Sequence, residues 1–425
     1  MRFLLSYSAD HFDPDLPRDQ HVHWGMSANV ISRTLHTALA RRGEVTFIDA
    51  TEPDRVAGQA FDVFIGIQRN FGAILEKCTV GRSVLVAVNM HPAEHNDLLL
   101  DFVVREEHPA AALHALDFQD VDRRVRDLEA ADSILLFGNS RTLESYTRHG
   151  IPAGKVRRMN FGVDLRAESP EDRVGNARPP TRILYSASEI GLRKGFDIVA
   201  SLTDEVNLGR LGGHLHIAGA ASYPHYQAKL DELLERLGPH VTNHGWLPAA
   251  SDSYRRLLDS CDYLLFPSLE EGQAGTVLDA MARGVVPLIS PNCGVDFAPL
   301  GFCELQLESA NNRALLMEAF ALPPTERGNL REKTIEYYDE SHEGFGDRLE
   351  STLDDVLGGS KAAAARQPGG VALRSAALRS PMRLAGGAPG LRHRARRRYL
   401  EVRLRWFNSW KVHQALGAVR RRLPV

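Results

Sequence analysis

Two acidic residues, Glu271 and Asp279, stand eight positions apart around the start of a predicted helix. Glu271 lies in a polar, glycine-containing loop, and Asp279 lies one turn into the helix that we expect over 276–283. A loop that opens a helix presents unpaired amides and the positive end of the helix dipole, so it favours an anion. Carboxylates near both ends of such a loop can hold the hydroxyl groups of a polar ligand.

Two other arrangements could bind a metal ion. Residues 91–95 read H-P-A-E-H, which is the H-x-x-E-H spacing of zinc hydrolases, with two histidine ligands and a glutamate base. That chemistry needs the middle of an amphipathic helix, whereas this motif follows a buried strand and has proline after its first histidine. Residues 120–122 read D-V-D, a metal-binding pair in other proteins, but here they open a charged helix. Zinc hydrolysis is therefore a remote alternative, and we expect no metal site.

The elements that position the two acids form one strand-loop-helix-strand unit. The apolar run 263–266 has the length of a buried parallel strand, and Pro267 and Ser268 end it. Gly284 closes the helix, and 285–290 forms the next strand. The carboxyl edge of a parallel sheet, where a strand passes into a helix, is where α/β proteins bind ligands.

The rest of the chain alternates short apolar runs with longer amphipathic ones, which is typical of βαβ units. This alternation begins again after residue 180, which predicts two similar α/β domains. In the first half we expect strands at 2–6, 44–48, 63–67, 83–88 and 133–137, and helices at 27–42, 121–130 and 139–149. In the second half we expect strands at 182–186 and 214–218, and helices at 196–202, 226–237, 315–320, 326–338 and 346–357.

Composition limits the classes of protein that this chain can be. Its 425 residues are 43% hydrophobic and 25% charged, which suits two or three globular domains. The four scattered cysteines have no paired spacing, so a disulfide scaffold and a zinc knuckle are both disfavoured and a reducing cytosol is expected. The first residues lack the pattern of a signal peptide, and no apolar run reaches the roughly 20 residues of a membrane span.

The stretch from Pro267 to Pro287 resembles the signature of the retaining group 1 glycosyltransferases of the GT-B fold, the type of glycosyltransferase family four. Their pattern is approximately P-S-x-x-E-G-F-G-x-x-x-L-E-A-M-A-x-G with a proline soon after. The matching residues are Pro267, Ser268, Glu271, Gly272, Leu278, Ala280, Met281, Ala282, Gly284 and Pro287. The resemblance implies two Rossmann-like domains that face a cleft, followed here by a basic C-terminal extension. It also implies transfer of a sugar from a nucleotide-sugar donor to a hydroxyl acceptor with retention.

The same resemblance implies roles for individual residues. Glu271 would grip the donor sugar, Asp279 the nucleotide ribose and Lys194 the diphosphate. His91 would lie near the reacting carbon, so the implied catalytic residues are Glu271, His91 and Lys194. The implied donor-binding residues are Gly25, Arg193, His244, Gly245, Gly272, Gln273, Ala274, Gly275, Thr276 and Asp279. No cofactor or metal is implied beyond the co-substrate, because Lys194 and the helix dipole would offset the charge of the phosphates.

Several positions depart from the family pattern. Gln273 and Ala274 replace a Phe-Gly pair, and Asp279 replaces the second glutamate. Glu189 stands where the family has an arginine before the lysine, so Arg193 is a candidate substitute. A paired glycine is reduced to Gly25. These departures leave open an alternative, a degenerate GT-B scaffold that binds a sugar or a partner without catalysis.

The predicted domains are an N-terminal acceptor domain at 1–165, a linker at 166–180 and a nucleotide-sugar domain at 181–340. A helix at 341–358 would return to the first domain. Residues 359–425 form a low-complexity linker and a basic amphipathic tail, in which 361–425 contain 16 Lys and Arg against one acid.

The tail combines arginines with tryptophans over 391–423, which fits an interfacial helix on anionic lipid. A solvated tail, or one that docks on the acidic body of the protein, fits equally well, and nothing indicates a specific nucleic-acid partner. We therefore expect a carbohydrate or lipid-linked acceptor and a cytoplasmic protein, peripheral on the inner face of the membrane if the tail binds lipid.

Overall fold

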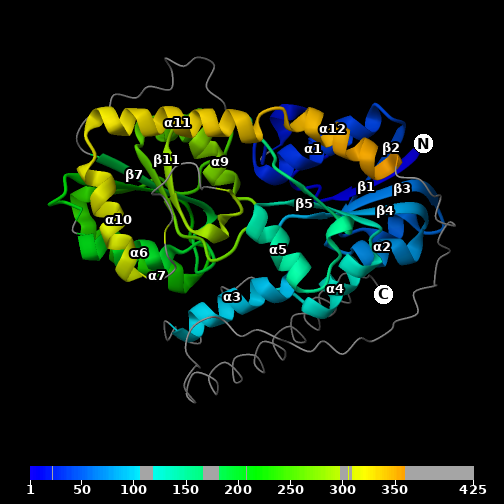
Figure 1. Ribbon diagram of the computed structural model, residues 1–425, viewed down its shortest axis with the longest axis horizontal. Coiled ribbons are helices and arrows are strands. Elements are labelled where there is room, and N and C mark those ends of the chain that lie inside the picture. The colour runs from blue at the N-terminus through cyan, green and yellow to red at the C-terminus, as the bar shows by residue number, and fades with distance from the viewer. Residues whose placement is uncertain are drawn as a thin grey trace, which may run out of the picture.

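The computed structural model describes residues 1–21, 23–105, 118–165, 181–206, 208–296, 305 and 309–358 (Figure 1). The predicted linker at 166–180 and the predicted extension at 359–425 lie outside these residues. The described chain forms two α/β halves side by side, as the α/β GT-B expectation requires. The predicted domain boundaries stay predictions. Within the described residues, none of the helices combines the length and hydrophobicity that crossing a bilayer requires.

The first half is built on a parallel sheet of six strands in the order β2-β1-β3-β4-β5-β6. Alternate residues of β1 face opposite sides of this sheet: Phe3 and Leu5 pack in one core and Leu4 in the other. Such a sheet is covered by helices on both faces, which explains why its central strands are almost continuously apolar. The strands are β1 (Arg2–Tyr7), β2 (Glu44–Asp49), β3 (Ala60–Ile67), β4 (Thr79–Ala87), β5 (Ser133–Phe137) and β6 (Val156–Met159).

The second half is a parallel sheet of five strands in the order β11-β10-β7-β8-β9. Every residue of β10 is buried, and Tyr263 at its start pairs with Ile183 of β7 on one side and Val286 of β11 on the other. The strands are β7 (Thr181–Glu189), β8 (Gly213–Ala220), β9 (Val241–Asn243), β10 (Tyr263–Phe266) and β11 (Val286–Ile289).

Helices connect the strands, and side-chain caps fix several of their starts. The Asp120 side chain accepts a hydrogen bond from the Arg123 amide at 3.1 Å, so the first acid of the D-V-D sequence is a helix cap. Asn139 caps the next helix through the Thr142 amide at 2.9 Å. The first-half helices are α1 (Ser27–Ala40), α2 (Phe71–Lys77), α3 (Pro92–Arg105), α4 (Val121–Ala130) and α5 (Ser140–Arg148). The others are α6 (Phe196–Val206), α7 (Pro224–Leu237), α8 (Asp252–Ser260), α9 (Gly275–Ala282), α10 (Ser309–Ala321), α11 (Pro324–His342) and α12 (Phe345–Gly358).

The last two helices tie the halves together. In Figure 1, α11 runs along the second half and α12 continues onto α1 of the first half. Arg42 at the end of α1 donates to the Asp354 carboxylate at 2.7 Å and to the Glu350 carbonyl at 3.1 Å. The hydroxyl of Tyr338 accepts the Val163 amide at 2.9 Å. The segment of the first half that contains Val163 is therefore bonded to the helix that leads back toward that half.

Candidate functional site

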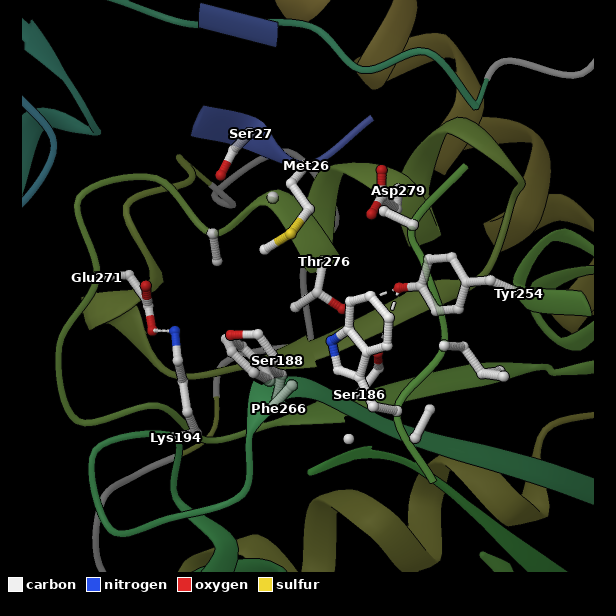
Figure 2. Close-up of a pocket in the computed structure, with 18 of the residues that line it drawn as sticks. Met26, Ser27, Ser186, Ser188, Lys194, Tyr254, Phe266, Glu271, Thr276 and Asp279 are labelled. Carbon is white, nitrogen blue, oxygen red and sulfur yellow. Dashed lines mark hydrogen bonds and ion pairs between the residues drawn. The ribbon is translucent and has the colours of Figure 1, made fainter. Parts of the chain in front are cut away.

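A pocket lies at the carboxyl edge of the second sheet, where the first half covers it (Figure 2). It encloses about 760 Å³ of empty space, part of it open to solvent. The ends of β7, β8 and β10 and the start of α9 form its walls, and Met26 and Ser27 enter from the start of α1. The lining also includes Ser186, Ser188, Lys194, Trp246, Tyr254, Phe266, Glu271, Gln273, Ala274, Gly275, Thr276 and Asp279.

Glu271 lies in the loop after β10, and its carboxylate is held by residues of the same half. Arg193 Nη1 and Ser268 Oγ each contact its Oε1 at 3.1 Å, and Lys194 forms an ion pair with the same oxygen (Figure 2). Burial by itself would raise the pKa of Glu271, but Lys194 and Arg193 hold that pKa below its ordinary value. Glu271 therefore borders the pocket as an ionised hydrogen-bond acceptor.

Lys194 reaches Glu271 because two loops pack backbone to backbone. Gly195 follows the lysine with a φ of +72°, in the left-handed region, and any side chain there would collide with the carbonyl of Pro267. The loop after β7 and the loop after β10 are thus in direct contact. Burial, together with the charge of Arg193, lowers the pKa of Lys194, while Glu271 acts in the opposite direction.

The loop after β10 also meets the first half with bare backbone. A side chain on Gly272 would collide with the carbonyl of Val88, just past the end of β4. Gly294 lies behind it with a φ of +71°, and a side chain there would collide with the Gly272 carbonyl. The loop that carries Glu271 is therefore shaped by the first half as well as by the second.

Helix α9 begins in the pocket wall without a side-chain cap. Ala274 precedes it and cannot cap it, so amides of the first turn are left for a ligand. Thr276 Oγ1 lies 3.2 Å from the hydroxyl of Tyr254, which lies 3.2 Å from Ser186 Oγ. This hydroxyl chain covers the wall between α9 and β7. Gly275 is close to Ser27 of the first half, since a methyl group there would lie 3.1 Å from its Cβ.

Asp279 is buried in the same wall, one turn into α9, with 5% of its surface exposed. Its Oδ1 is buried and has no hydrogen-bond partner in the described structure. Burial raises the pKa of Asp279 well above the ordinary value, and the nearby Asp164 adds to the effect. A buried carboxyl oxygen without a partner is costly, and a ligand hydroxyl would satisfy it.

Two predicted donor residues make close contacts with other parts of the protein: Gln273 lines the pocket, whereas Gly25 does not. Gln273 accepts the Phe161 amide at 2.9 Å and donates to Asn160 Oδ1 at 2.9 Å, which links the pocket wall to the first half. Gly25 has a φ of +85°, and a methyl group on it would lie 2.9 Å from the Cβ of Ala250. The two residues that follow Gly25, Met26 and Ser27, line the pocket.

His91 does not line the pocket. Its ring stacks on His149 with 4.3 Å between ring centroids, and its amide donates to Ser145 Oγ at 2.9 Å. Its buried Nε2 has no hydrogen-bond partner among the residues that the structure describes. Burial and the neighbouring His149 lower the pKa of His91 to about 3, against an opposing effect of Glu94. The histidine is thus neutral and turned toward α5, and its role at the donor sugar stays a prediction.

The turn after β9 places its aromatic residue in the pocket, not its histidine. His244 Nε2 lies 3.0 Å from His216 Nδ1 and does not line the pocket. Gly245 has a φ of +64°, and its carbonyl accepts the Gly219 amide at 2.8 Å. These bonds orient the turn so that Trp246 is the residue on the pocket wall.

Glu189 stays away from the predicted phosphate region. Its two carboxylate oxygens accept the amide and the hydroxyl of Ser222 at 3.0 Å and 2.9 Å. The acid that replaces the family's arginine therefore bonds the loop before α7. Arg193, the predicted substitute, lies beside Glu271.

The three side chains of the H-x-x-E-H motif do not converge. His91 precedes α3, Glu94 contacts Arg148 at 2.7 Å, and His95 Nδ1 lies 2.6 Å from Glu270. In the part of the chain that the structure describes, no group of three or more His, Cys, Asp or Glu could hold a metal ion.

Sequence reasoning found Lys194 but missed several other pocket residues that stand outside the glycosyltransferase signature. They come from the start of α1, the ends of β7 and β10, the turn after β9 and helix α8, and Met26 and Trp246 stood beside predicted positions. The missed residues are Met26, Ser27, Ser186, Ser188, Trp246, Tyr254 and Phe266.

Comparison with known proteins supports the fold, and a family model matches part of the second half. Residues 181–312 match a family model described as glycosyl transferases group 1. Among curated proteins, none matches the chain. Sucrose-phosphate synthase from Thermosynechococcus elongatus is a similar solved structure, with 16% identity over 84% of this chain and 100% of that one and a TM-score of 0.60.

Two further solved structures also resemble the chain. WaaG, a glycosyltransferase involved in lipopolysaccharide biosynthesis, is 14% identical over 84% of this chain and 100% of that one, with a TM-score of 0.56. Anabaena HepE, solved with UDP and glucose, is 13% identical over 85% and 100%, with a TM-score of 0.54. The chain spans 55% of the length of TarM from S. aureus, another structure that it matches. The chain therefore has the GT-B fold, and residues 181–312 within its second half match the model of the group 1 glycosyl transferases.

Proposed function

We propose that this protein transfers a sugar from a nucleotide-sugar donor to a hydroxyl acceptor with retention at the anomeric carbon. The observation that carries the proposal is the pocket itself, in which Glu271 with its two cations and the buried Asp279 lie on either side of the start of α9. This arrangement matches a ligand with a diphosphate in the middle and hydroxyl groups at both ends.

The diphosphate would lie against the first-turn amides of α9. Lys194 and Arg193 would then leave the Glu271 carboxylate and bind the diphosphate oxygens. Charge-assisted bonds of this kind stabilise the negative charge that grows on a leaving diphosphate. Asp279 would then accept hydroxyls of the nucleotide ribose, and Glu271, released from its cations, those of the donor sugar. The cations and the helix dipole supply the charge compensation.

The proposed transfer is a front-face substitution without a covalent enzyme intermediate. The bond between the anomeric carbon and the phosphate oxygen breaks, and a bond to the acceptor oxygen forms on the same face. The proton of the acceptor hydroxyl passes to the leaving phosphate oxygen. Glu271 positions the sugar in this scheme and forms no bond with it.

The acceptor would lie on the side of the first half, next to Met26 and Ser27. HepE was solved with UDP and glucose, and WaaG takes part in lipopolysaccharide biosynthesis. These two neighbours favour a carbohydrate or lipid-linked acceptor, for example in the cell envelope. The alternative is a GT-B scaffold that binds a sugar or partner without catalysis. The altered Glu189 position favours it, whereas Arg193 beside Glu271 argues against it.

The test is calorimetric titration of the full chain with UDP, GDP and ADP, without added metal. We expect one nucleotide to bind with micromolar affinity. Lys194→Ala should weaken this binding about 10- to 100-fold, the equivalent of one charge-assisted bond. Glu271→Ala is the matched variant, and it should bind the free nucleotide at least as well as the wild type because Lys194 is no longer held by the carboxylate. Absence of binding by all three nucleotides would favour the scaffold.

We also propose that the basic tail at 391–423 lies on anionic membrane surfaces. Its net positive charge and interleaved tryptophans are the supporting observations. A chain truncated after residue 358 should stop sedimenting with phosphatidylserine vesicles and keep its nucleotide affinity. Undiminished sedimentation would rule the tail out as the anchor.

A further inference from the structure

Glu270, the residue before the predicted sugar-binding acid, reaches across the boundary between the two halves. Its side chain is fully buried and does not line the pocket. Oε1 accepts the Met90 amide at 2.7 Å, just past β4, and Oε2 lies 2.6 Å from Nδ1 of His95 on α3. His95 is also fully buried. Both hydrogen bonds of this second-half carboxylate that the structure describes thus go to the first half.

Burying such a carboxylate is unfavourable unless its oxygens find partners. Here they find an amide, an imidazole nitrogen and, 4.0 Å away, Nη1 of Arg193. Two of these three partners are present only when the halves are together. If the halves separate, Glu270 and His95 must each be hydrated again, so their contact favours the closed arrangement.

The contact also bears on Glu271, whose Cα is only about 3.8 Å along the chain. Arg193 Nη1 links the two residues, because it donates to the Glu270 carbonyl at 3.2 Å and to Glu271 Oε1 at 3.1 Å. On the other side of Glu271, Gln273 is bonded to Phe161 and Asn160 of the first half. The segment 270–273 is therefore fixed by the first half at both ends.

We propose that Glu270 and His95 form a positioning pair that closes the cleft and thereby sets the place of the Glu271 carboxylate at the donor sugar. This inference rests on the proposed glycosyltransferase function. Glu270 itself touches no ligand, since it is buried outside the pocket. It acts by transmitting the position of the first half to the next residue of the loop.

Four variants of the full chain test the pair. Glu270→Ala and His95→Ala each remove one side of the contact. His95→Asn keeps a nitrogen donor close to the position of Nδ1. Glu94→Gln is the matched control, because it alters a buried acid one residue away on α3 whose bonds to Arg148 and His149 stay within the first half.

Small-angle X-ray scattering in the presence of the bound nucleotide gives the first readout. We expect a larger radius of gyration for Glu270→Ala and for His95→Ala, and wild-type values for His95→Asn and Glu94→Gln. The second readout is the rate of donor hydrolysis. Both alanine variants should lose at least 10-fold in kcat and change nucleotide affinity less than about threefold, since the nucleotide contacts lie in the second half. The double alanine variant should be no slower than either single variant.

The outcomes separate the two levels of inference. If no nucleotide binds the wild type, the proposed function fails, while the scattering comparison still tests the pair without ligand. If nucleotide binds and the alanine variants keep both the wild-type radius and the wild-type kcat, the positioning pair is overturned. An equal loss in Glu94→Gln would also overturn it, because the effect would then reflect general damage to α3.

Discussion

At the scale of single residues, the pocket contains a carboxyl group that folding alone does not satisfy. The pKa of Asp279 is raised by burial, so the folded protein holds its proton more tightly than the unfolded chain. The stability that depends on this proton is present at low pH and is lost as pH rises through the folded pKa. Asp279→Asn removes the titrating group. The free energy of unfolding of this variant should therefore exceed that of the wild type by a margin that grows with pH. We expect about 1–3 kcal/mol at pH 8, measured by urea unfolding at pH 5 and pH 8.

The same substitution should weaken nucleotide binding about 10-fold, because it replaces one of the two carboxyl oxygens that can accept ribose hydroxyls with an NH2 group, which cannot accept them. Asp127→Asn is a matched control. Asp127 is also buried, its Oδ2 has no hydrogen-bond partner among the described residues, and burial raises its pKa to about 6. It lies on α4, far from the pocket in the chain, and its replacement should leave nucleotide affinity unchanged. A stability difference for Asp279→Asn that is independent of pH would contradict this account.

At the scale of elements, the site depends on the backbone contact between the loops after β7 and β10. Gly195→Ala introduces a side chain at a positive φ and against the Pro267 carbonyl, so the two loops must separate. We expect the loop that carries Lys194 to move this lysine away from the diphosphate position, so that nucleotide affinity falls more than 10-fold, as measured by calorimetry. Gly212→Ala is the control, since Gly212 has a φ of +66° in the same half but open space around it. It should cost about 1–2 kcal/mol of stability and leave affinity intact.

The elements that sequence alone predicts best are those with long apolar runs or clear caps. The strands β1, β2, β5, β7, β8 and β10 and the helices α1, α4 and α5 lie within two or three residues of their expected bounds. Strands β6 and β9 escaped prediction because they are short and carry polar or charged residues such as Arg157 and Arg158. Helix α3 escaped because Pro92 reads as a break, although proline is well tolerated in the first turn.

The pocket was predictable where its residues share one stretch of sequence. Glu271 and Asp279 follow from the spacing in one strand-loop-helix unit, and Thr276 and Lys194 from the resemblance. Tyr254 reaches the pocket from α8 through contacts that no linear spacing records. His91 shows the opposite problem, because a position after a strand does not fix the direction of the side chain, and packing against His149 turned it toward α5.

At the scale of the whole molecule, acid should loosen the crossing between the halves. His342 ends α11, and its Nδ1 lies 3.0 Å from the Phe161 carbonyl of the first half. Burial lowers its pKa to about 4, although the bond to Phe161 acts in the opposite direction. The unfolded chain gains a proton here near pH 6.5 and the folded chain only near pH 4. Stability is therefore lost as pH falls through that window, by on the order of 3 kcal/mol from this residue.

His342→Gln should flatten this acid limb, since glutamine can still donate to the Phe161 carbonyl and does not titrate. Urea unfolding at pH 7, 6, 5 and 4.5 measures the slope for the variant and for the wild type. An identical slope for both proteins would show that another group governs acid stability.

The bare backbone contact between Gly272 and the carbonyl of Val88 also limits how the two halves of this chain can be re-engineered. A common route to a new product would be a chimera, in which the first half is exchanged for one from another source. The graft boundary of such a chimera would not be confined to the covalent linkers. It would include a non-covalent seam after β4, where an inserted residue or a shifted carbonyl would press directly on the segment that carries Glu271. Libraries of chimeras should therefore keep the backbone length after β4 fixed and vary the loops on the far side of the first sheet.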